Sequence, residues 1–183
     1  MVDFQEKPLL RLIQSPRLNL IAATTDLIKK DIAGRAILAD ALGVIIPESW
    51  PPDLYGPRAM QFALMQLDDP SEHGWSFWYL AMADDPGELV GICGFKGRPD
   101  EKGSVEIGYS VLSSFQRRGI ATEAVTRLVG WAFSHHNVTE VSAETLPHLT
   151  QSIRVLQKNG FVRSGAGSEA GVIRFAIKRS HLD

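Results

Sequence analysis

The sequence predicts an α/β domain in which helices cover both faces of a mixed sheet, and three observations support this fold class. Residues 104–111 alternate apolar and polar side chains, which is typical of a half-buried strand. Residues 120–133 repeat apolar side chains with a helical period and predict a wide core-facing stripe. Turns rich in Asp, Pro and Gly at 84–87 and 97–100 separate short apolar segments, as in an antiparallel meander.

In chain order we expect a strand, two helices, three strands, a helix, a strand, a helix and two strands. The seven strands are predicted near 17–21, 75–82, 89–95, 104–111, 138–145, 161–163 and 172–178. The four helices are predicted near 27–36, 60–67, 120–133 and 150–158. A helix that connects the fourth and fifth strands makes them parallel neighbours with a right-handed crossover. Prolines between 47 and 52 exclude helix there and indicate a loop between the first two helices.

Length and composition limit the class of protein. The chain has 183 residues, 44% of them hydrophobic, which suits one domain over 15–183 preceded by a tail over 1–14. A net charge of −2 argues against a nucleic acid or an acidic membrane surface as the main partner. The single cysteine, Cys93, fits a reducing compartment, and with no signal peptide or spanning segment expected, we predict a cytoplasmic protein. The five histidines have no metal-ligand spacing, so we expect no metal.

Residues 111–122 carry the most chemical information, because they lead from a strand through a short loop into an amphipathic helix. The first turn of a helix has unpaired amide donors and the positive end of the dipole. Small residues and Gly119 would let a diphosphate approach these donors, and Arg117 and Arg118 add charge nearby. The alternative is that Gly119 only permits a tight turn and the arginines are solvated.

Three motifs give the chain a resemblance to the GNAT acetyltransferase superfamily, and to its RimJ/RimL-like branch in particular. Gln116-x-x-Gly119-x-Ala121 resembles the superfamily signature Q/R-x-x-G-x-G/A. Val105-Glu106-Ile107-Gly108-Tyr109 precedes it. Ser152-Ile153-Arg154-Val155-Leu156, ending in Asn159-Gly160-Phe161, follows it. The motifs stand in family order, and the likeness covers about residues 15 to 180.

The resemblance implies an acetyl-CoA-dependent N-acetyltransferase that acts by direct attack in a ternary complex. It implies a mostly antiparallel seven-stranded sheet that splays between strands 4 and 5, with the pantetheine arm lying in the opening. The implied cofactor contacts are Val111, Leu112, Ser113, Gln116, Arg117, Arg118, Gly119, Ile120, Ala121, Thr122, Ser152, Val155 and Leu156. Among these, the amides from Arg117 to Thr122 would hold the pyrophosphate, while Val111 and Leu112 would contribute main-chain groups.

The catalytic residues are expected from the same resemblance. Glu106, on the polar row of its strand, is the candidate general base and a substrate contact, although a charge on an alternating strand is often only solvated. Glu144 and Glu169 are lesser candidates. Many relatives have a tyrosine acid where this chain has Leu156, so Ser152 is the candidate acid; it could instead bond its own backbone.

The acceptor side is less defined by the sequence. Trp50 lies in the loop that caps the acceptor site in this fold, so we expect it to contact substrate or act as a lid. The aromatic residues of the strand that begins near Trp75 are expected to be buried in the core instead of lining an acceptor pocket. The sequence fits either of two acceptors, a protein N-terminus or a small amine. A homodimer could form through an edge strand near the C-terminus. The alternative function is a non-catalytic acyl-CoA sensor.

Overall fold

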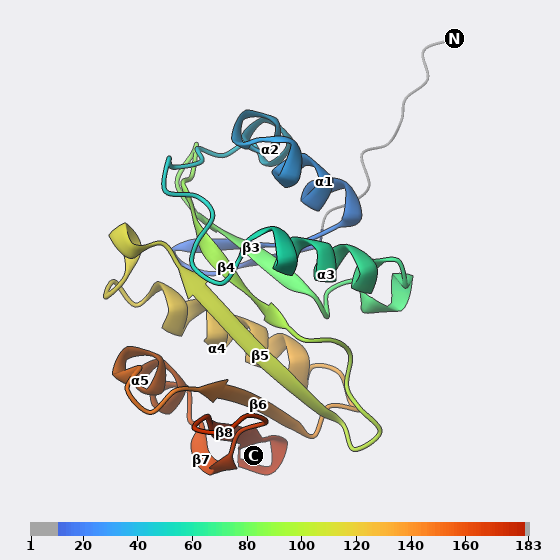
Figure 1. The fold of residues 1–183 in the computed structure, drawn as a ribbon, viewed down its shortest axis with the longest axis vertical. Helices are drawn as coiled ribbons and strands as arrows, with labels where there is room; N and C mark the ends of the chain where they lie inside the picture. The colour runs from blue at the N-terminus through green and yellow to red at the C-terminus, as the bar shows by residue number, and fades with distance from the viewer. Residues whose placement is uncertain (1–10, 182–183) are drawn as a thin grey trace.

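The computed structural model describes residues 11–181, which form one open mixed sheet of eight strands with five α-helices. The strand order is β1-β2-β3-β4-β5-β6-β8-β7 (Figure 1). The strands are β1 (Leu12–Gln14), β2 (Leu18–Ala22), β3 (Phe77–Met82), β4 (Leu89–Phe95), β5 (Ser104–Val111), β6 (Glu140–Thr145), β7 (Val162–Ala166) and β8 (Ile173–Lys178). The helices are α1 (Thr25–Ala33), α2 (Arg35–Leu42), α3 (Pro57–Leu67), α4 (Ile120–Phe133) and α5 (Thr150–Lys158).

The predicted fold class and element order are confirmed, with two corrections to the element count. The expected tail contains an eighth strand, because β1 pairs antiparallel with β2 through Leu12 opposite Ile21. Three residues are too few for an alternation signal, and residues 1–10 of the expected tail lie outside the described part. The first predicted helix is two helices, because Gly34 has a φ of 145°, which no helix continues.

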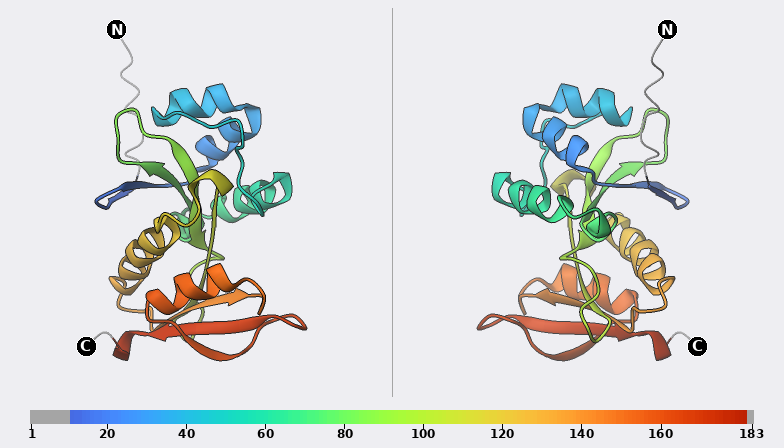
Figure 2. Two further views of the ribbon diagram at one scale, coloured as in Figure 1. Left: turned by 90° about the vertical axis from the view of Figure 1, so that its left-hand side faces the viewer. Right: turned by 90° about the vertical axis from the view of Figure 1, so that its right-hand side faces the viewer.

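Helices cover both faces of the sheet (Figure 2). On one face, Trp131 of α4 packs against Trp78 and Phe95, with ring centroids 5.4 and 5.8 Å apart. We call this the α4 face. On the other face, Tyr55, from the loop before α3, packs against Phe77 at 4.7 Å, and we call this the α3 face. Side chains from both faces make up the buried core.

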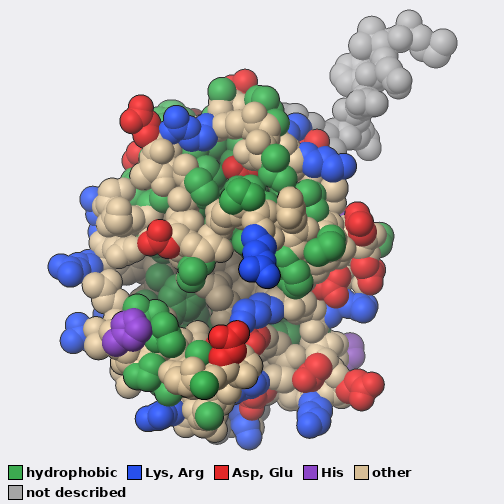
Figure 3. Space-filling view, in the orientation of Figure 1, with side chains coloured by type: hydrophobic (Ala, Val, Ile, Leu, Met, Phe, Trp, Pro, Cys, Tyr) green, Lys and Arg blue, Asp and Glu red, His purple; other side chains and the backbone are tan. Residues whose placement is uncertain are grey.

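β5 loses one of its two neighbours halfway along its length. It pairs with β4 from Ile107 to Val111, but it pairs with β6 only over Ser104 to Glu106. The parallel pairing predicted for these strands is confirmed, and so is the splay, since β5 continues without its β6 partner. The surface seen in Figure 3 is hollowed at this place, between β5 and α5.

The register fixes which backbone groups of β5 face the opening. The backbone carbonyl of Glu106 accepts from the backbone N–H of Lys96, and the backbone N–H of Leu112 donates to the carbonyl of Val90. Both groups therefore point toward β4. Backbone groups alternate in direction along a strand, so Gly108 and Ser110 also face β4, while the amides of Tyr109 and Val111 face the opening. The strand therefore presents an unpaired edge beside β6.

Candidate functional site

The loop between β5 and α4 presents a run of free amide donors. Gly119 precedes α4 with a left-handed φ of 78°, and Arg117 is also left-handed at 63°. Within residues 11–181, no acceptor bonds the backbone N–H of any residue from Arg117 to Thr122. Alternating backbone conformations of this kind form anion-binding concavities, and the helix dipole favours negative charge at the same end. The loop has the donor set that a diphosphate requires.

Gln116 stabilises this loop instead of pointing into it. Its Nε2 donates to the carbonyl of Val111 at 3.0 Å, which ties the end of β5 to the turn before α4. The short 3₁₀ turn Ser113–Phe115 lies between them, with Ser113 exposed and Phe115 buried. The glutamine of the sequence signature therefore has a structural role in the free protein.

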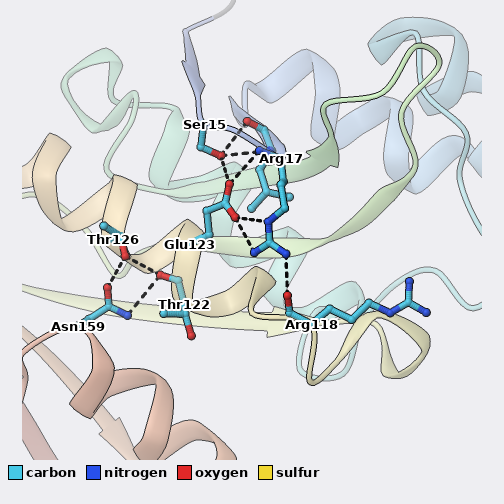
Figure 4. Close-up of polar contacts among 8 residues, drawn as sticks. Ser15, Arg17, Arg118, Thr122, Glu123, Thr126 and Asn159 are labelled. Carbon is cyan, nitrogen blue, oxygen red and sulfur yellow. Dashed lines mark hydrogen bonds and ion pairs between the residues drawn. The ribbon is translucent and has the colours of Figure 1, made fainter.

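The two arginines of the loop are exposed. The guanidinium of Arg118 lies over the ring of Phe115, with Cζ 5.1 Å from the centroid, and its side chain extends away from Glu123 (Figure 4). Exposed guanidinium groups beside free amides add positive charge to the loop at little desolvation cost. Both arginines lie where the sequence analysis expected charge.

Across the opening, Tyr109 of β5 meets Ser152 of α5. The Tyr109 hydroxyl lies 3.0 Å from Ser152 Oγ and donates to the Ser152 carbonyl at 3.0 Å. Burial raises the pKa of Tyr109 to about 12, so the phenol is protonated at neutral pH. Tyr109 belongs to the second sequence motif, but no sequence pattern indicates this contact, because it depends on the packing of α5.

Asn159 joins the two walls of the opening. Its Nδ2 donates to the carbonyl of Thr122 at 3.3 Å and to that of Val155 at 2.9 Å. Its Oδ1 accepts from Thr126 Oγ1 at 2.6 Å (Figure 4). Asn159 belongs to the third sequence motif, and in the structure it fixes α5 against the first turns of α4.

The predicted base, Glu106, lies on the α3 face, opposite Lys96 on the neighbouring strand. The two side chains form an ion pair, and Glu106 is more buried than Lys96. Its position on the polar row of β5 is confirmed by the register. The carboxylate lies on the same face as Gly108, where nothing lies within 4 Å of an added Cβ. A half-buried carboxylate beside open space can accept a proton from a ligand that enters there.

The lesser base candidates differ in environment. Glu144 accepts from the backbone N–H of Ser168 at 2.9 Å and from its Oγ at 2.6 Å. The pKa of Glu144 is lowered by the hydrogen bonds from the Ser168 hydroxyl and amide, and by the nearby charges of Lys96 and Arg174. A carboxylate held ionised by so many donors is a weak base. Glu169 is exposed in the loop before β8.

Three predicted contacts do not fit the structure. Leu112 donates its N–H to Val90 and accepts from Phe115, so its backbone groups are already used. Leu156 is fully buried in the core and offers no surface to a cofactor, whereas Val155 and Ser152 are half-buried beside the opening. Trp50 is also buried, at 7% exposure, with its ring directed inward. We therefore no longer propose Leu112, Leu156 or Trp50 as direct contacts.

Trp50 instead helps to hold a buried carboxyl group. Its Nε1 donates to Asp31 Oδ1 at 2.9 Å, while the hydroxyls of Tyr55 and Tyr79 donate to Oδ2 at 3.2 and 3.1 Å. Asp31 is 8% exposed. Burial raises the pKa of Asp31 above its ordinary value, although the three hydrogen bonds act in the opposite direction. This cluster joins α1 and the loop around Trp50 to β3.

The described residues contain no group of three or more His, Cys, Asp and Glu side chains that could hold a metal ion. No helix in this part of the chain is long and apolar enough to cross a bilayer. The anion-binding loop and the splayed strands are thus the features that indicate a ligand.

Comparison with known proteins identifies the family. Residues 27–162 match the acetyltransferase (GNAT) domain family. The chain is 30% identical over 128 residues to the uncharacterized N-acetyltransferase YjdG of Bacillus subtilis, which spans 70% of this chain and 76% of that protein. It is 24% identical over 112 residues to the [ribosomal protein uS5]-alanine N-acetyltransferase of Escherichia coli, covering 60% of this chain and 57% of that one.

Solved structures have the same fold. Mycobacterium smegmatis RimJ, in complex with CoA-disulfide, superposes with a TM-score of 0.60 at 21% identity, covering 94% of this chain and 87% of that chain. An acetyltransferase from Agrobacterium tumefaciens gives a TM-score of 0.64 at 16% identity, covering 92% and 95%.

We expect the raised pKa of Asp31 to make stability depend on pH. An acid whose pKa is higher in the folded state stabilises fully below its unfolded value of 3.8, and that contribution is lost as pH rises through the folded pKa. The free energy of unfolding of wild type, minus that of Asp31→Asn, should therefore fall as pH rises above the unfolded pKa of 3.8 and level off once pH exceeds the folded pKa. Urea denaturation measures it. A difference that grows with pH would show a carboxylate stabilised by its three donors.

Proposed function

The chain belongs to the GNAT acetyltransferase family and is an acetyl-CoA-dependent N-acetyltransferase; on this premise we propose how its own residues bind the cofactor and perform the transfer. The pyrophosphate accepts from the amides between Arg117 and Thr122, and the pantetheine arm pairs with the open edge of β5. The observation that carries this proposal is the run of six amides without acceptors among the described residues, beside an unpaired strand edge.

The reaction follows as direct attack in a ternary complex. The amine nitrogen attacks the thioester carbonyl carbon, the carbon–sulfur bond breaks, and the sulfur leaves with the bonding pair. The amide of Val111 faces the opening and polarises the carbonyl oxygen. Glu106 takes one proton from the ammonium ion, and the neutral nitrogen that results loses its second proton to water as the amide forms. The thiolate takes the Ser152 proton, water then returns a proton to Ser152, and Glu106 releases its own proton to solvent. Acetyl-CoA and amine thus become an amide and coenzyme A.

Two features support Glu106 as the base. It lies on the α3 face beside the open space at Gly108, and amines approaching from that face meet a half-buried carboxylate. Lys96 pairs with it in the free protein, so an incoming ammonium group takes over a position already suited to a cation. Deprotonation then proceeds directly or through water.

The contact with Tyr109 supports Ser152 as the acid. The single phenol hydrogen points at the Ser152 carbonyl in the structure; when it turns to Ser152 Oγ instead, the serine hydrogen is free to point at the departing sulfur. The phenol also stabilises the serine oxygen once its proton has left. A tyrosine thus lies in the opening after all, but it comes from β5 instead of α5.

The acceptor is a primary amine, either a protein N-terminus or a small molecule. The E. coli relative acts on a ribosomal-protein alanine by its name, which favours the first. A homodimer would form through β7, the edge strand, whose residues are all exposed. A cytoplasmic location agrees with a single buried cysteine. Size-exclusion chromatography and turnover with an amine panel test the dimer and the acceptor.

Coenzyme A at about a hundred times its Kd should raise the melting temperature by roughly 5–10 °C. Amide exchange at Tyr109 and Val111, measured by NMR, should slow on binding, while Gly108 and Ser110, already paired to β4, should change little. Thiol release from acetyl-CoA with amines present separates an enzyme from a sensor. Stabilisation without protection of these two amides would place the pantetheine elsewhere.

Glu106→Gln should lower kcat/KM for the amine by about 10²–10⁴-fold, because the base is lost. The Kd for coenzyme A should stay unchanged. The loss should shrink as pH approaches the pKa of the amine, where the amine is already neutral. Glu144→Gln is the matched control, a carboxylate on the same face of the sheet, and it should retain most activity. Equal losses in the two variants would remove Glu106 as base.

Ser152→Ala should lower kcat by at least about tenfold with acetyl-CoA. The loss should disappear with an aryl thioester, whose leaving thiolate needs no proton. Tyr109→Phe should have a smaller effect, and none when Ser152 is already Ala, because the phenol acts through the serine. Steady-state kinetics on the three variants measures this. Additive losses would contradict the pairing of the two hydroxyls.

A further inference from the structure

A cluster of polar side chains, from the turn between β1 and β2 and from α4, holds the cofactor loop from behind. Ser15 Oγ donates to Glu123 Oε1 at 2.7 Å, and the backbone N–H of Arg17 donates to the same oxygen at 3.0 Å. Arg17 Nε and Nη2 both lie 2.7 Å from Glu123 Oε2. Arg17 Nη1 donates to the carbonyl of Arg118 at 2.8 Å (Figure 4). We call Ser15, Arg17 and Glu123 the clasp.

Glu123 is ionised within the clasp. Burial acts to raise its pKa, but hydrogen bonds from Ser15 and Arg17, together with the Arg17 charge, lower it overall. Its side chain is 15% exposed, and it lies in the first turn of α4, where the helix dipole also favours a negative charge. Arg127 follows Glu123 by four residues on α4, but the structure pairs Glu123 with Arg17.

We propose that the clasp positions the amides that bind the pyrophosphate, so that Arg17 and Glu123 are positioning residues for acetyl-CoA. This inference rests on the proposed cofactor site. A peptide unit is planar and trans, so its carbonyl and its N–H point in opposite directions. With the Arg118 carbonyl held on Arg17, the N–H of Gly119 must point away from Arg17, out of the clasp.

The loop needs this external support. Arg117 and Gly119 both have positive φ, at 63° and 78°, and a positive φ is unfavourable for an arginine. The Arg118 carbonyl lies between these two residues, and without the clasp its peptide plane is free to rotate. Rotation would replace an amide by a carbonyl oxygen beside the phosphates, which repels them. The clasp therefore favours the binding conformation before the cofactor arrives.

Arg17 acts through the loop and not on the phosphates themselves. Its guanidinium is engaged by Glu123 and by the Arg118 carbonyl at the distances above, leaving its charge balanced by the carboxylate. A Cβ added at Gly119 would lie 3.3 Å from Arg17 Nη2, so the guanidinium packs directly behind the glycine. A side chain at residue 119 would press against the clasp.

The experiment compares two acetyl donors, one with and one without the pyrophosphate that the loop binds. Glu123→Gln and Arg17→Lys should each raise the Kd for coenzyme A and the KM for acetyl-CoA by about tenfold. The kcat at saturation and the KM for the amine should stay within about twofold, because the reacting groups are untouched. With acetyl-pantetheine, which lacks the pyrophosphate, kcat/KM should equal that of wild type.

Glu72→Gln is a matched control. Glu72 also accepts from an arginine side chain and from the backbone N–H of that arginine, Arg98, at 3.0 and 3.1 Å. The side chains of Arg98 and Glu72 are 50% and 15% exposed. In the clasp, the side chains of Arg17 and Glu123 are 48% and 15% exposed. Arg98 lies in the turn before β5, at the other end of that strand from the cofactor loop. This variant should lose similar stability but bind coenzyme A like wild type.

Unchanged affinity for coenzyme A in both clasp variants would overturn the inference while leaving the cofactor site intact. Equal losses with acetyl-CoA and acetyl-pantetheine would overturn it as well, because they would show a general effect on the fold. If wild type itself did not bind coenzyme A, the proposed cofactor site would fail and this inference with it. Should Glu123→Gln not fold, Arg17→Lys, at a half-exposed position, decides between these outcomes.

Discussion

The site depends on one constraint: β5 pairs with β6 only as far as Glu106 and then continues with a single neighbour. A strand edge inside a sheet leaves backbone donors and acceptors unpaired, which is unfavourable unless something else pairs with them. Here the opening lies directly before the loop and helix that carry free amides. An extended ligand with an anionic end satisfies both groups at once, which is how the fold couples strand geometry to cofactor binding.

The two faces of β5 carry different candidate catalytic residues. Glu106 lies on the α3 face, from which the acceptor would approach in the proposed reaction, while Tyr109 reaches across to Ser152 from the α4 face. Because successive side chains of a strand point to opposite faces, one strand supplies both the base side and the leaving-group side. In the proposed reaction the thioester would lie between them, in the plane of the opening. Asn159 and the clasp keep α5 and the loop at fixed positions around it.

Much of the fold was predictable from the sequence, and the predictions that the structure corrected failed for physical reasons. The amphipathic period over 120–133 and the alternation over 104–111 report burial along one element, and both elements are present. β1 was missed because three residues show no period. The Trp50 contact was misassigned because a proline-rich loop gives no sign of which way a side chain turns. Its indole points to Asp31, a residue that no local pattern brings near it.

The sequence by itself determined the order of elements, the family, and the glycine at which the cofactor loop turns, because these depend on neighbouring residues and on signature spacing. Only the tertiary structure decided which amides face the opening, that Tyr109 meets Ser152, and that Arg17 holds Glu123 from 106 residues away. The physical reason is that such contacts depend on how separate elements pack. Packing is set by the whole core, so no short segment contains that information.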